Sequence, residues 1–292
     1  MRRAFRDSLN DVFSSNEELF LLLGDIGVFG FKDILKQHPE RAINIGILEQ
    51  SMMGIVAGLS KVGFIPVLHS IAPFLIERCY EQIKLVAGYH ESNCRIVSIG
   101  ASFDYVNLGP THHCPADIAI LSAIPNLQLV IPATASDFRK LFLSSLTLNG
   151  PMYFRLTDNS SDMDIDVEYG KLRLLNSTED RSNIILSIGP MIDVAEDVAN
   201  QLKLTHLNCT MLSPFDSNSL AGFIDDGGAI HIIEPYFEGS TFMSLSDLSA
   251  KYRFFFYGYS KSFKSTCGEQ RDVMRENRLT SDLLIERLYE RL

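Results

Sequence analysis

The chain alternates short, strongly apolar runs with segments of helical periodicity, and this alternation restricts the fold more than any other feature. In the first half, runs with strand character lie at 19–25, 43–46, 64–68, 94–100, 127–132 and 152–156. Helical patterns occur between them, among them 75–88 and 135–146. Strands that are apolar along their whole length are typical of parallel sheets, in which helices cover both faces. We therefore expect an α/β fold built on a parallel sheet.

A second alternation follows a polar interruption. After Thr157 the composition turns polar and acidic, beginning with the stretch TDNSSDMDID. Beyond it come apolar runs at 183–189, 206–212, 228–234 and 253–258, with a helical pattern at 191–202. Because a linker-like segment separates the two alternations, we expect two α/β domains, at 1–160 and 183–292, joined by a linker at 161–182.

Charge and composition exclude several classes of protein. The 292 residues are 46% hydrophobic, enough for a full core, and the formal net charge is −10. This charge argues against nucleic acid or an anionic membrane as the partner. No apolar run approaches the length of a membrane-spanning helix, about 18 residues. Five cysteines, never spaced C-x-x-C, indicate reduced thiols in a cytoplasmic protein; they are Cys79, Cys94, Cys114, Cys209 and Cys267.

One carboxylate stands in an otherwise apolar stretch, NIGILEQSMMGIVAGLSKVGFIP at 44–66. Apolar residues recur at helical spacing from Leu48 to Ser60, and Gly63 ends the expected helix before a strand. Glu49 therefore lies in the first turn. Burying an unpaired carboxylate costs several kcal/mol, so this side chain is at a surface, paired, or protonated for use. The helix dipole, which favours a negative charge there, is the simplest structural explanation.

Ligands of such sheets bind at the carboxyl ends of the strands, so the residues that follow each strand are the candidates for a site. Together these loops resemble the C-terminal half of the transketolase family, its pyrimidine-binding and C-terminal domains. The resemblance spans nearly the whole chain in the family's order. The matching stretches are GDIG (24–27), PERAINIGILEQSMMGIVAGLSKVGFIP (39–66), APFLIERCYEQI (72–83), GPTHH (109–113), DIAILSAIPNLQLVIPA (117–133), GPMYFRL (150–156) and HIIEPYFEGS (231–240).

The resemblance implies a thiamine diphosphate cofactor and assigns Glu49 a catalytic role. In the family, the glutamate of the G-I-x-E-Q motif bonds a ring nitrogen of the cofactor's aminopyrimidine. A protonated carboxyl there stabilises the imino tautomer that takes up the proton of the cofactor's own reactive carbon, and burial favours the protonated form. The cofactor serves as electron sink while the protein positions and polarises it.

Further positions match the family's cofactor and substrate residues. Phe74 matches an aromatic that packs on the aminopyrimidine; an ordinary core position is its alternative. Ile71 stands where many members have a second aromatic, so it can pack but not stack. Asp25 matches an aspartate near the cofactor, although a loop-capping role explains it equally well. His112 matches the active-site histidine, suited to proton transfer or to orienting a substrate hydroxyl, and His113 is expected to point elsewhere.

The substrate side departs from the family's pattern. Leu108 replaces an aspartate that contacts a substrate hydroxyl, and Gly100 stands where a histidine is expected. Asp158 replaces an arginine that grips the substrate phosphate, and it would repel that group; nearby Arg155 is an alternative cation. His69 is a further candidate for a polar substrate contact, with a solvated strand-end position as its alternative. The resemblance thus implies ketol transfer between sugars or sugar derivatives, on a non-standard substrate.

The chain also lacks the family's G-D-G motif, which with a later asparagine holds the diphosphate and Mg²⁺. We therefore expect no metal ligands here and a separate diphosphate-binding subunit, in an α₂β₂ assembly. Two alternatives remain open: the β subunit of a 2-oxo acid dehydrogenase, which shares both domains, and a catalytically silent structural subunit.

Overall fold

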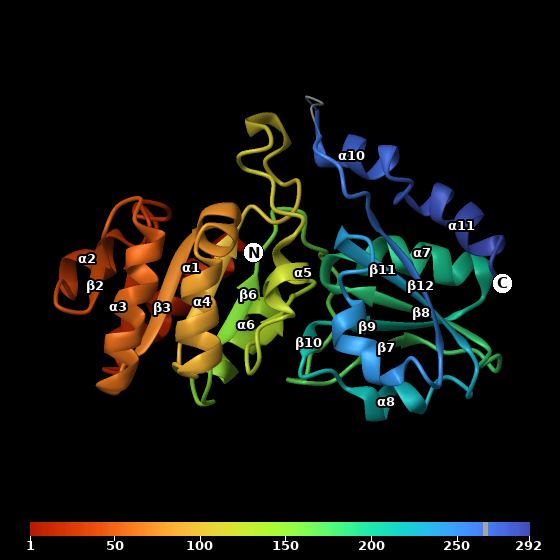
Figure 1. Ribbon diagram of the computed structural model, residues 1–292, viewed down its shortest axis with the longest axis horizontal. Coiled ribbons are helices and arrows are strands. Elements are labelled where there is room, and N and C mark those ends of the chain that lie inside the picture. The colour runs from red at the N-terminus through yellow and green to blue at the C-terminus, as the bar shows by residue number, and fades with distance from the viewer. Residues whose placement is uncertain (265–267) are drawn as a thin grey trace.

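The strand runs of the first half join one sheet in the computed structural model, which describes residues 1–264 and 268–292 (Figure 1). Cys267 lies outside the described residues. The sheet has the order β10-β5-β6-β4-β3-β1-β2, and its neighbours are parallel except for β10, which is antiparallel to β5. The expected parallel sheet is thereby confirmed. Its strands are β1 (Leu19–Leu23), β2 (Ala42–Asn44), β3 (Ile65–Ile71), β4 (Arg95–Ile99), β5 (Gln128–Val130), β6 (Met152–Arg155) and β10 (Met211–Ser213).

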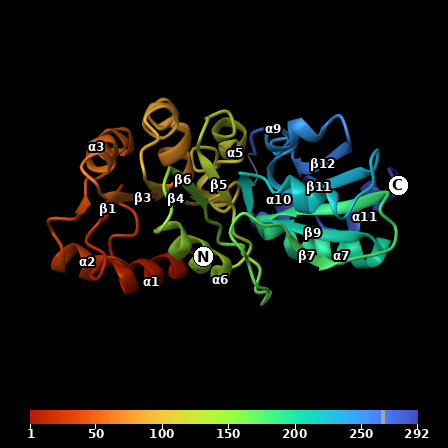
Figure 2. The ribbon, with the colours of Figure 1, turned by 90° about the horizontal axis from the view of Figure 1, so that it is seen from below.

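Helices cover both faces of this sheet because its strands are apolar on both sides. Alternate residues of a strand point to opposite faces. Leu21 of β1 shares a core cluster with Phe5 and Phe138, whereas Leu22 shares another with Met53. Figure 2 shows α1, α2 and α6 on one side and α3 and α5 on the other. The helices are α1 (Arg2–Phe13), α2 (Lys32–Gln37), α3 (Glu49–Lys61), α4 (Tyr80–Ile83), α5 (Asp117–Leu121) and α6 (Ala135–Ser145).

The helix expected at 75–88 is not continuous. It consists of two wide turns, η1 (Pro73–Glu77) and η2 (Lys84–Tyr89), which flank α4. The backbone N–H of Arg78 donates to the carbonyl of Pro73 at 3.1 Å, a spacing of five residues instead of four. Such widened turns are frequent at functional sites. A 3₁₀ turn, η3 (Val106–Leu108), lies in the loop after β4.

The second sheet has the order β12-β11-β8-β9-β7. Its edge strand β7 falls inside the range 161–182, which the sequence led us to expect as a linker. Local composition hides it, because polar residues flank only two leucines and its antiparallel partner β9 lies about thirty residues away. The domain boundaries themselves stay a prediction. The elements are β7 (Arg173–Asn176), β8 (Asn183–Ile188), α7 (Ile192–Leu202), β9 (Thr205–Cys209), α8 (Ser217–Ala221), β11 (Ala229–Phe237), α9 (Phe242–Leu245), β12 (Arg253–Tyr259), α10 (Gln270–Glu276) and α11 (Ser281–Tyr289), with the 3₁₀ turns η4 (Gly189–Met191) and η5 (Ser246–Leu248).

The apolar run at 206–212, expected as one strand, is two strands that join different sheets. β9 pairs with β8 in the second sheet, and β10 pairs with β5 in the first. At the crossing, the N–H of Ile131 donates to the carbonyl of Thr210 at 2.7 Å. The chain thus passes directly from the second sheet to the first, and a backbone hydrogen bond also joins the two at this crossing. Within the described residues, none of the helices has the length and apolar character to span a membrane.

Candidate active site

The strands β1, β3 and β4 end side by side at the carboxyl edge of the first sheet, and α3 begins there. Glu49 is the first residue of α3 and its side chain is 1% exposed. Ser70 Oγ donates to its Oε1 at 2.8 Å, and Arg78 Nη1 donates to its Oε2 at 3.0 Å. We considered a surface, a paired and a protonated state for this carboxylate, and the structure shows the paired one, with the side chain buried.

Gly24, which follows β1, leaves room for this carboxylate. A Cβ at this position would lie 3.1 Å from Ser70 Oγ and 3.3 Å from Glu49 Oε1. Both distances are tighter than an ordinary van der Waals contact, so a side chain here would press on the hydrogen-bonded pair. The first glycine of GDIG thus fits the close packing around Glu49, where a larger residue would make Ser70 and Glu49 shift.

Arg78 and Phe74 together connect Glu49 to His112. The guanidinium of Arg78 lies over the Phe74 ring, 4.4 Å from its centroid, while it also bonds Glu49. The His112 ring meets Phe74 edge-on, with centroids 5.2 Å apart, and its Nδ1 lies 3.0 Å from Thr111 Oγ1. Three residues predicted from separate segments are therefore gathered at one place.

His113 points elsewhere, as expected. Its side chain is buried, with Nε2 placed 3.2 Å from the carbonyl of Val106 and its ring edge-on to Phe103 at 5.0 Å. The chain turns at His112, whose N–H donates to the carbonyl of Gly109 at 2.9 Å, and of the two histidines His112 is the one whose ring meets Phe74. A group of three or more His, Cys, Asp or Glu side chains able to hold a metal ion does not occur among the described residues.

Gly100 has a physical reason to lack a side chain. Its φ is +76°, and a Cβ would clash with the ring of Tyr105 and lie 3.2 Å from Cγ2 of Ile71. Tyr105 therefore fills the space that a histidine at position 100 would need. Ile71, which is buried at the end of β3, lies next to the same position.

Asp25 is exposed, adopts a left-handed φ of +60° and pairs with Asn44. Its backbone N–H donates to Asn44 Oδ1 at 3.0 Å, and Asn44 Nδ2 donates to its Oδ1 at 3.1 Å. These bonds match the loop-capping alternative. A role toward a cofactor stays a prediction for this residue.

His69 is buried on the face of the sheet opposite Ser70, so the solvated position considered for it is wrong. Its Nδ1 lies 2.9 Å from the carbonyl of Val97, and its ring packs against Phe5 at 4.8 Å. Burial lowers the pKa of His69 to about 4, which keeps the ring neutral. The alternation along β3 separates it from Glu49.

His69 instead lines a cavity between α1 and the loop that follows β1. The sequence did not predict the arginines of this cavity, because the pattern of an N-terminal helix does not show which loop the helix will pack against. The cavity is lined by Arg2, Arg3 and Arg6 of α1 together with Phe5, His69 and the loop 25–31.

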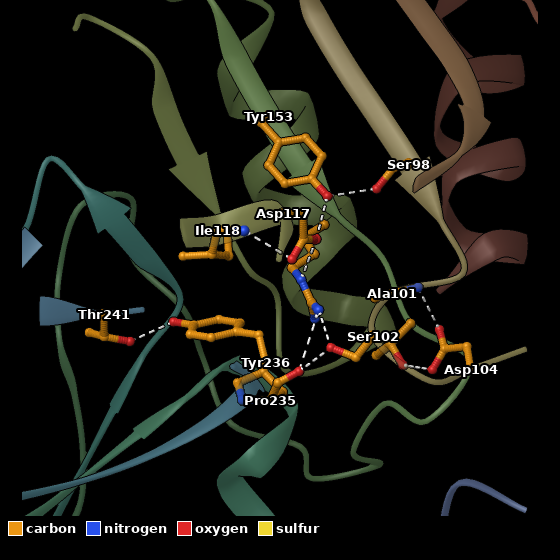
Figure 3. A network of polar contacts seen from close by, with 12 residues as sticks. Ser98, Ala101, Ser102, Asp104, Asp117, Ile118, Tyr153, Pro235, Tyr236 and Thr241 are labelled. Carbon is orange, nitrogen blue, oxygen red and sulfur yellow. Dashed lines mark hydrogen bonds and ion pairs between the residues drawn. The ribbon is translucent and has the colours of Figure 1, made fainter. Parts of the chain in front are cut away.

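Of the three substituted substrate-side positions, Leu108 and Asp158 are exposed, whereas Gly100 is buried. Leu108 is 56% exposed, in the loop that carries His112. Asp158 is held by its backbone, whose N–H donates to Asp104 Oδ2 at 3.1 Å. Asp104 also accepts bonds from Ala101, which Figure 3 shows, and from Thr157 and Asn159, so it joins the His112 loop to the Asp158 loop. Burial raises the pKa of Asp104 to about 6.

Arg155 is not available as a substitute cation. It is buried and pairs with Asp117 at 2.7 Å, and Asp117 also accepts from Tyr153 at 2.9 Å. Its Nη2 donates to Ser102 Oγ at 2.5 Å and contacts the carbonyl of Pro235 in the second sheet. This network, drawn in Figure 3, ties the two sheets together and engages the guanidinium of Arg155 in bonds within the protein.

The residues around Glu49 fit the aminopyrimidine part of the cofactor that the resemblance implied. A buried carboxyl can bond a ring nitrogen, and the aromatic face of Phe74 lies beside it. The same residues match Mg²⁺ and its diphosphate poorly, because Mg²⁺ takes an octahedral set of oxygen ligands, whereas the carboxylate of Glu49 is already bonded to Ser70 and Arg78.

Comparisons with known proteins give the same family as the sequence motifs. A family model described as the pyrimidine-binding domain of transketolase matches residues 1–161. An uncharacterized 33.6 kDa protein in the fasciation locus of Rhodococcoides fascians is 30% identical over 243 residues, which cover 82% of this chain and 77% of that one. One subunit of a 6-deoxy-6-sulfo-D-fructose transketolase from Clostridium sp. (strain MSTE9) is 29% identical, with 79% and 74% covered. One subunit of an apulose-4-phosphate transketolase from Phocaeicola vulgatus is 26% identical, with 80% and 78% covered.

Among solved structures, a split-gene transketolase described as an inactive beta4 tetramer superimposes with a TM-score of 0.81. The match covers 99% of this chain and 96% of that one, at 24% sequence identity. At this identity the likeness establishes the fold alone.

Proposed function

Because this chain belongs to the transketolase family, we propose that it is the pyrimidine-binding, C-terminal subunit of a split transketolase that depends on thiamine diphosphate. The observation that carries the proposal is the buried carboxylate of Glu49 at the carboxyl edge of the sheet, beside Phe74 and near His112. The reaction is transfer of a two-carbon ketol unit between sugars or sugar derivatives.

Each residue of this site has a distinct task. When bound, thiamine diphosphate supplies the carbon nucleophile and electron sink for breaking and forming bonds next to a carbonyl. Glu49 holds or gives a proton at the ring nitrogen, and Ser70 orients it through Oε1. Phe74 and Ile71 form the apolar wall against the ring. His112 moves a proton at a substrate hydroxyl or carbonyl oxygen.

The substrate we propose is a sugar that carries an anionic group held differently from the family's usual phosphate. Asp158 and Leu108 disfavour the usual contacts, while Arg2, Arg3 and Arg6 line a cavity against the loop 25–31 that follows β1. Guanidinium groups bind phosphate or sulfonate oxygens through charge-assisted bonds. The names of two relatives, which act on a phosphorylated and a sulfonated sugar, support a substrate outside the usual set.

A separate subunit supplies the diphosphate and Mg²⁺ site. Exposed apolar side chains on β2, on the loop before α3 and on α3 itself support a partner surface there; they are Ile43, Ile47, Leu48 and Ile55. We propose an α₂β₂ assembly in which the cofactor lies between subunits. Buried free thiols at Cys79, Cys94, Cys114 and Cys209 support a cytoplasmic location.

The test is activity in the reconstituted complex. This chain is combined with the diphosphate-binding subunit, sought in an adjacent open reading frame, together with thiamine diphosphate and Mg²⁺. Ketol transfer without decarboxylation of 2-oxo acids is expected. Decarboxylation alone would identify the β subunit of a 2-oxo acid dehydrogenase, and a complex that binds no cofactor would identify a structural subunit.

Glu49→Gln gives the residue-level test. Gln keeps the volume but cannot shift a proton, so turnover should fall by roughly 10²–10⁴-fold. The fold should stay intact, because the amide can still bond Ser70. Turnover within twofold of the unchanged complex would remove Glu49 from the mechanism.

A further inference from the structure

Arg78 occupies both features that make the Glu49 site suitable for an aminopyrimidine. Its Nη1 donates to Glu49 Oε2 at 3.0 Å, and its guanidinium lies 4.4 Å from the centroid of the Phe74 ring. A ring stacked on Phe74 and bonded to this carboxyl would need the same volume. The guanidinium and the cofactor ring therefore compete for one place.

The two partners also require different forms of the carboxyl group. An ion pair with a guanidinium requires the carboxylate, which only accepts hydrogen bonds. Donation to a ring nitrogen requires a protonated carboxyl, which has no charge to attract Arg78. The exchange of partners at Oε2 is thus coupled to the proton that the proposed mechanism uses.

The backbone of Arg78 is fixed while its side chain has a way out. Its N–H donates to the carbonyl of Pro73 at 3.1 Å in the wide turn η1, and its carbonyl accepts from Gln50 Nε2 at 3.1 Å. The side chain is 41% exposed, whereas Glu49 is 1% exposed. A rotation about the side-chain torsions moves the guanidinium into solvent without a backbone change. Ser70 then still donates to the carboxyl group.

We propose that Arg78 is a displaceable cap on the cofactor site, which neutralises Glu49 and covers Phe74 until the aminopyrimidine replaces it on both. This inference rests on the proposed function. The cap stabilises a buried carboxylate that would otherwise be unpaired, and it weakens cofactor binding by the interactions that must first break. Arg78 is accordingly a residue that sets cofactor affinity.

The experiment measures the dissociation constant of thiamine diphosphate by calorimetry in the complex with the diphosphate-binding subunit and Mg²⁺. Arg78→Met keeps an unbranched apolar stem in place of the arginine's and removes the guanidinium with its charge. The matched control is Arg139→Met, which removes an arginine of similar exposure, 46%, paired with Asp11 on α1 at 2.9 Å. Arg78→Met should tighten binding by about tenfold, the factor expected for a partly exposed ion pair and a cation–π contact together. The control should match the unchanged chain.

A second measurement needs no cofactor and covers the case in which the complex fails to form. In the isolated chain, urea unfolding of Glu49→Gln, Arg78→Met and the double variant reports whether the pair is coupled. The cap predicts that Arg78→Met lowers stability and that the loss is smaller when Glu49 is already Gln.

The outcomes separate this inference from the function on which it rests. Unchanged or weaker cofactor binding by Arg78→Met, with an intact complex, would overturn the cap and make Arg78 a bystander or a cofactor ligand. Additive unfolding free energies would overturn it as well. Failure of the unchanged complex to bind thiamine diphosphate would instead refute the proposed function.

Discussion

Substituting Arg155 by Met should destabilise the folded chain strongly, because it leaves Asp117 as a buried charge without its partner. The two side chains are 1% and 0% exposed and lie 2.7 Å apart. The substitution also removes the bond from Arg155 to Ser102 and the contact with Pro235, so the second sheet loses a link to the first. Tyr153 is then the remaining side-chain donor to Asp117 in this network.

Breaking a buried pair by removing one partner costs about 3–5 kcal/mol. A second estimate agrees. The bonds from Arg155 to Asp117 and Ser102 both involve a charged group, and two such bonds contribute about 3–6 kcal/mol together. Against a total stability of about 5–15 kcal/mol for a domain, this loss is large. We therefore expect the urea midpoint to fall steeply, as followed by far-ultraviolet circular dichroism.

The double variant Arg155→Met with Asp117→Asn provides the control, because it removes both charges. It should be less destabilised than the sum of the two single variants, by about 1–3 kcal/mol of coupling. A loss below about 1 kcal/mol for Arg155→Met would refute a buried, fully paired network, since an exposed pair costs that little. Additive single variants would refute the pairing itself.

Three further outcomes follow from the site. Gly100→Ala should cost about 2–5 kcal/mol by urea unfolding, from its φ of +76° and the approach to Tyr105; adding Tyr105→Ala should recover the steric part, and a neutral Gly100→Ala would contradict the packing. His69 has a pKa lowered from 6.5 to about 4, so the folded state binds fewer protons there and loses stability as the pH falls through this range. The variant His69→Asn should lose up to about 3 kcal/mol less stability over this pH range than the unchanged chain. The same pH dependence of stability in both proteins would exclude this contribution of His69. Asp158→Arg should lower the KM for a phosphorylated sugar by about tenfold with cofactor affinity unchanged, and no change in KM would dismiss the repulsion.

Much of the fold was predictable because its signals are local. The apolar runs that become β1, β3 and β4 are buried on both faces, and α3 shows its period and its glycine end in the sequence. β7 and the break between β9 and β10 were not predictable, since both depend on strands that lie far away in sequence. The wide turns around α4 carry no periodicity that separates them from an ordinary helix.

The candidate site was predictable where one residue type in one motif was enough. Glu49, Phe74 and His112 come from three segments, and the structure gathers them at one place. Arg78 was missed because its importance depends on its contacts with Glu49 and Phe74, which no spacing in the sequence predicts. The same holds for the arginines of α1, whose charge matters only once the loop after β1 lies against them.

The most direct test of the central claim is the exchange rate of the acidic carbon proton of thiamine diphosphate, followed by NMR after transfer to deuterated water. The complex of this chain with its diphosphate-binding subunit and Mg²⁺ should speed the exchange far beyond that of free cofactor. With Glu49→Gln in the same complex, the rate should fall by roughly 10²–10⁴-fold. Exchange by the Glu49→Gln complex at the unchanged rate would contradict the account.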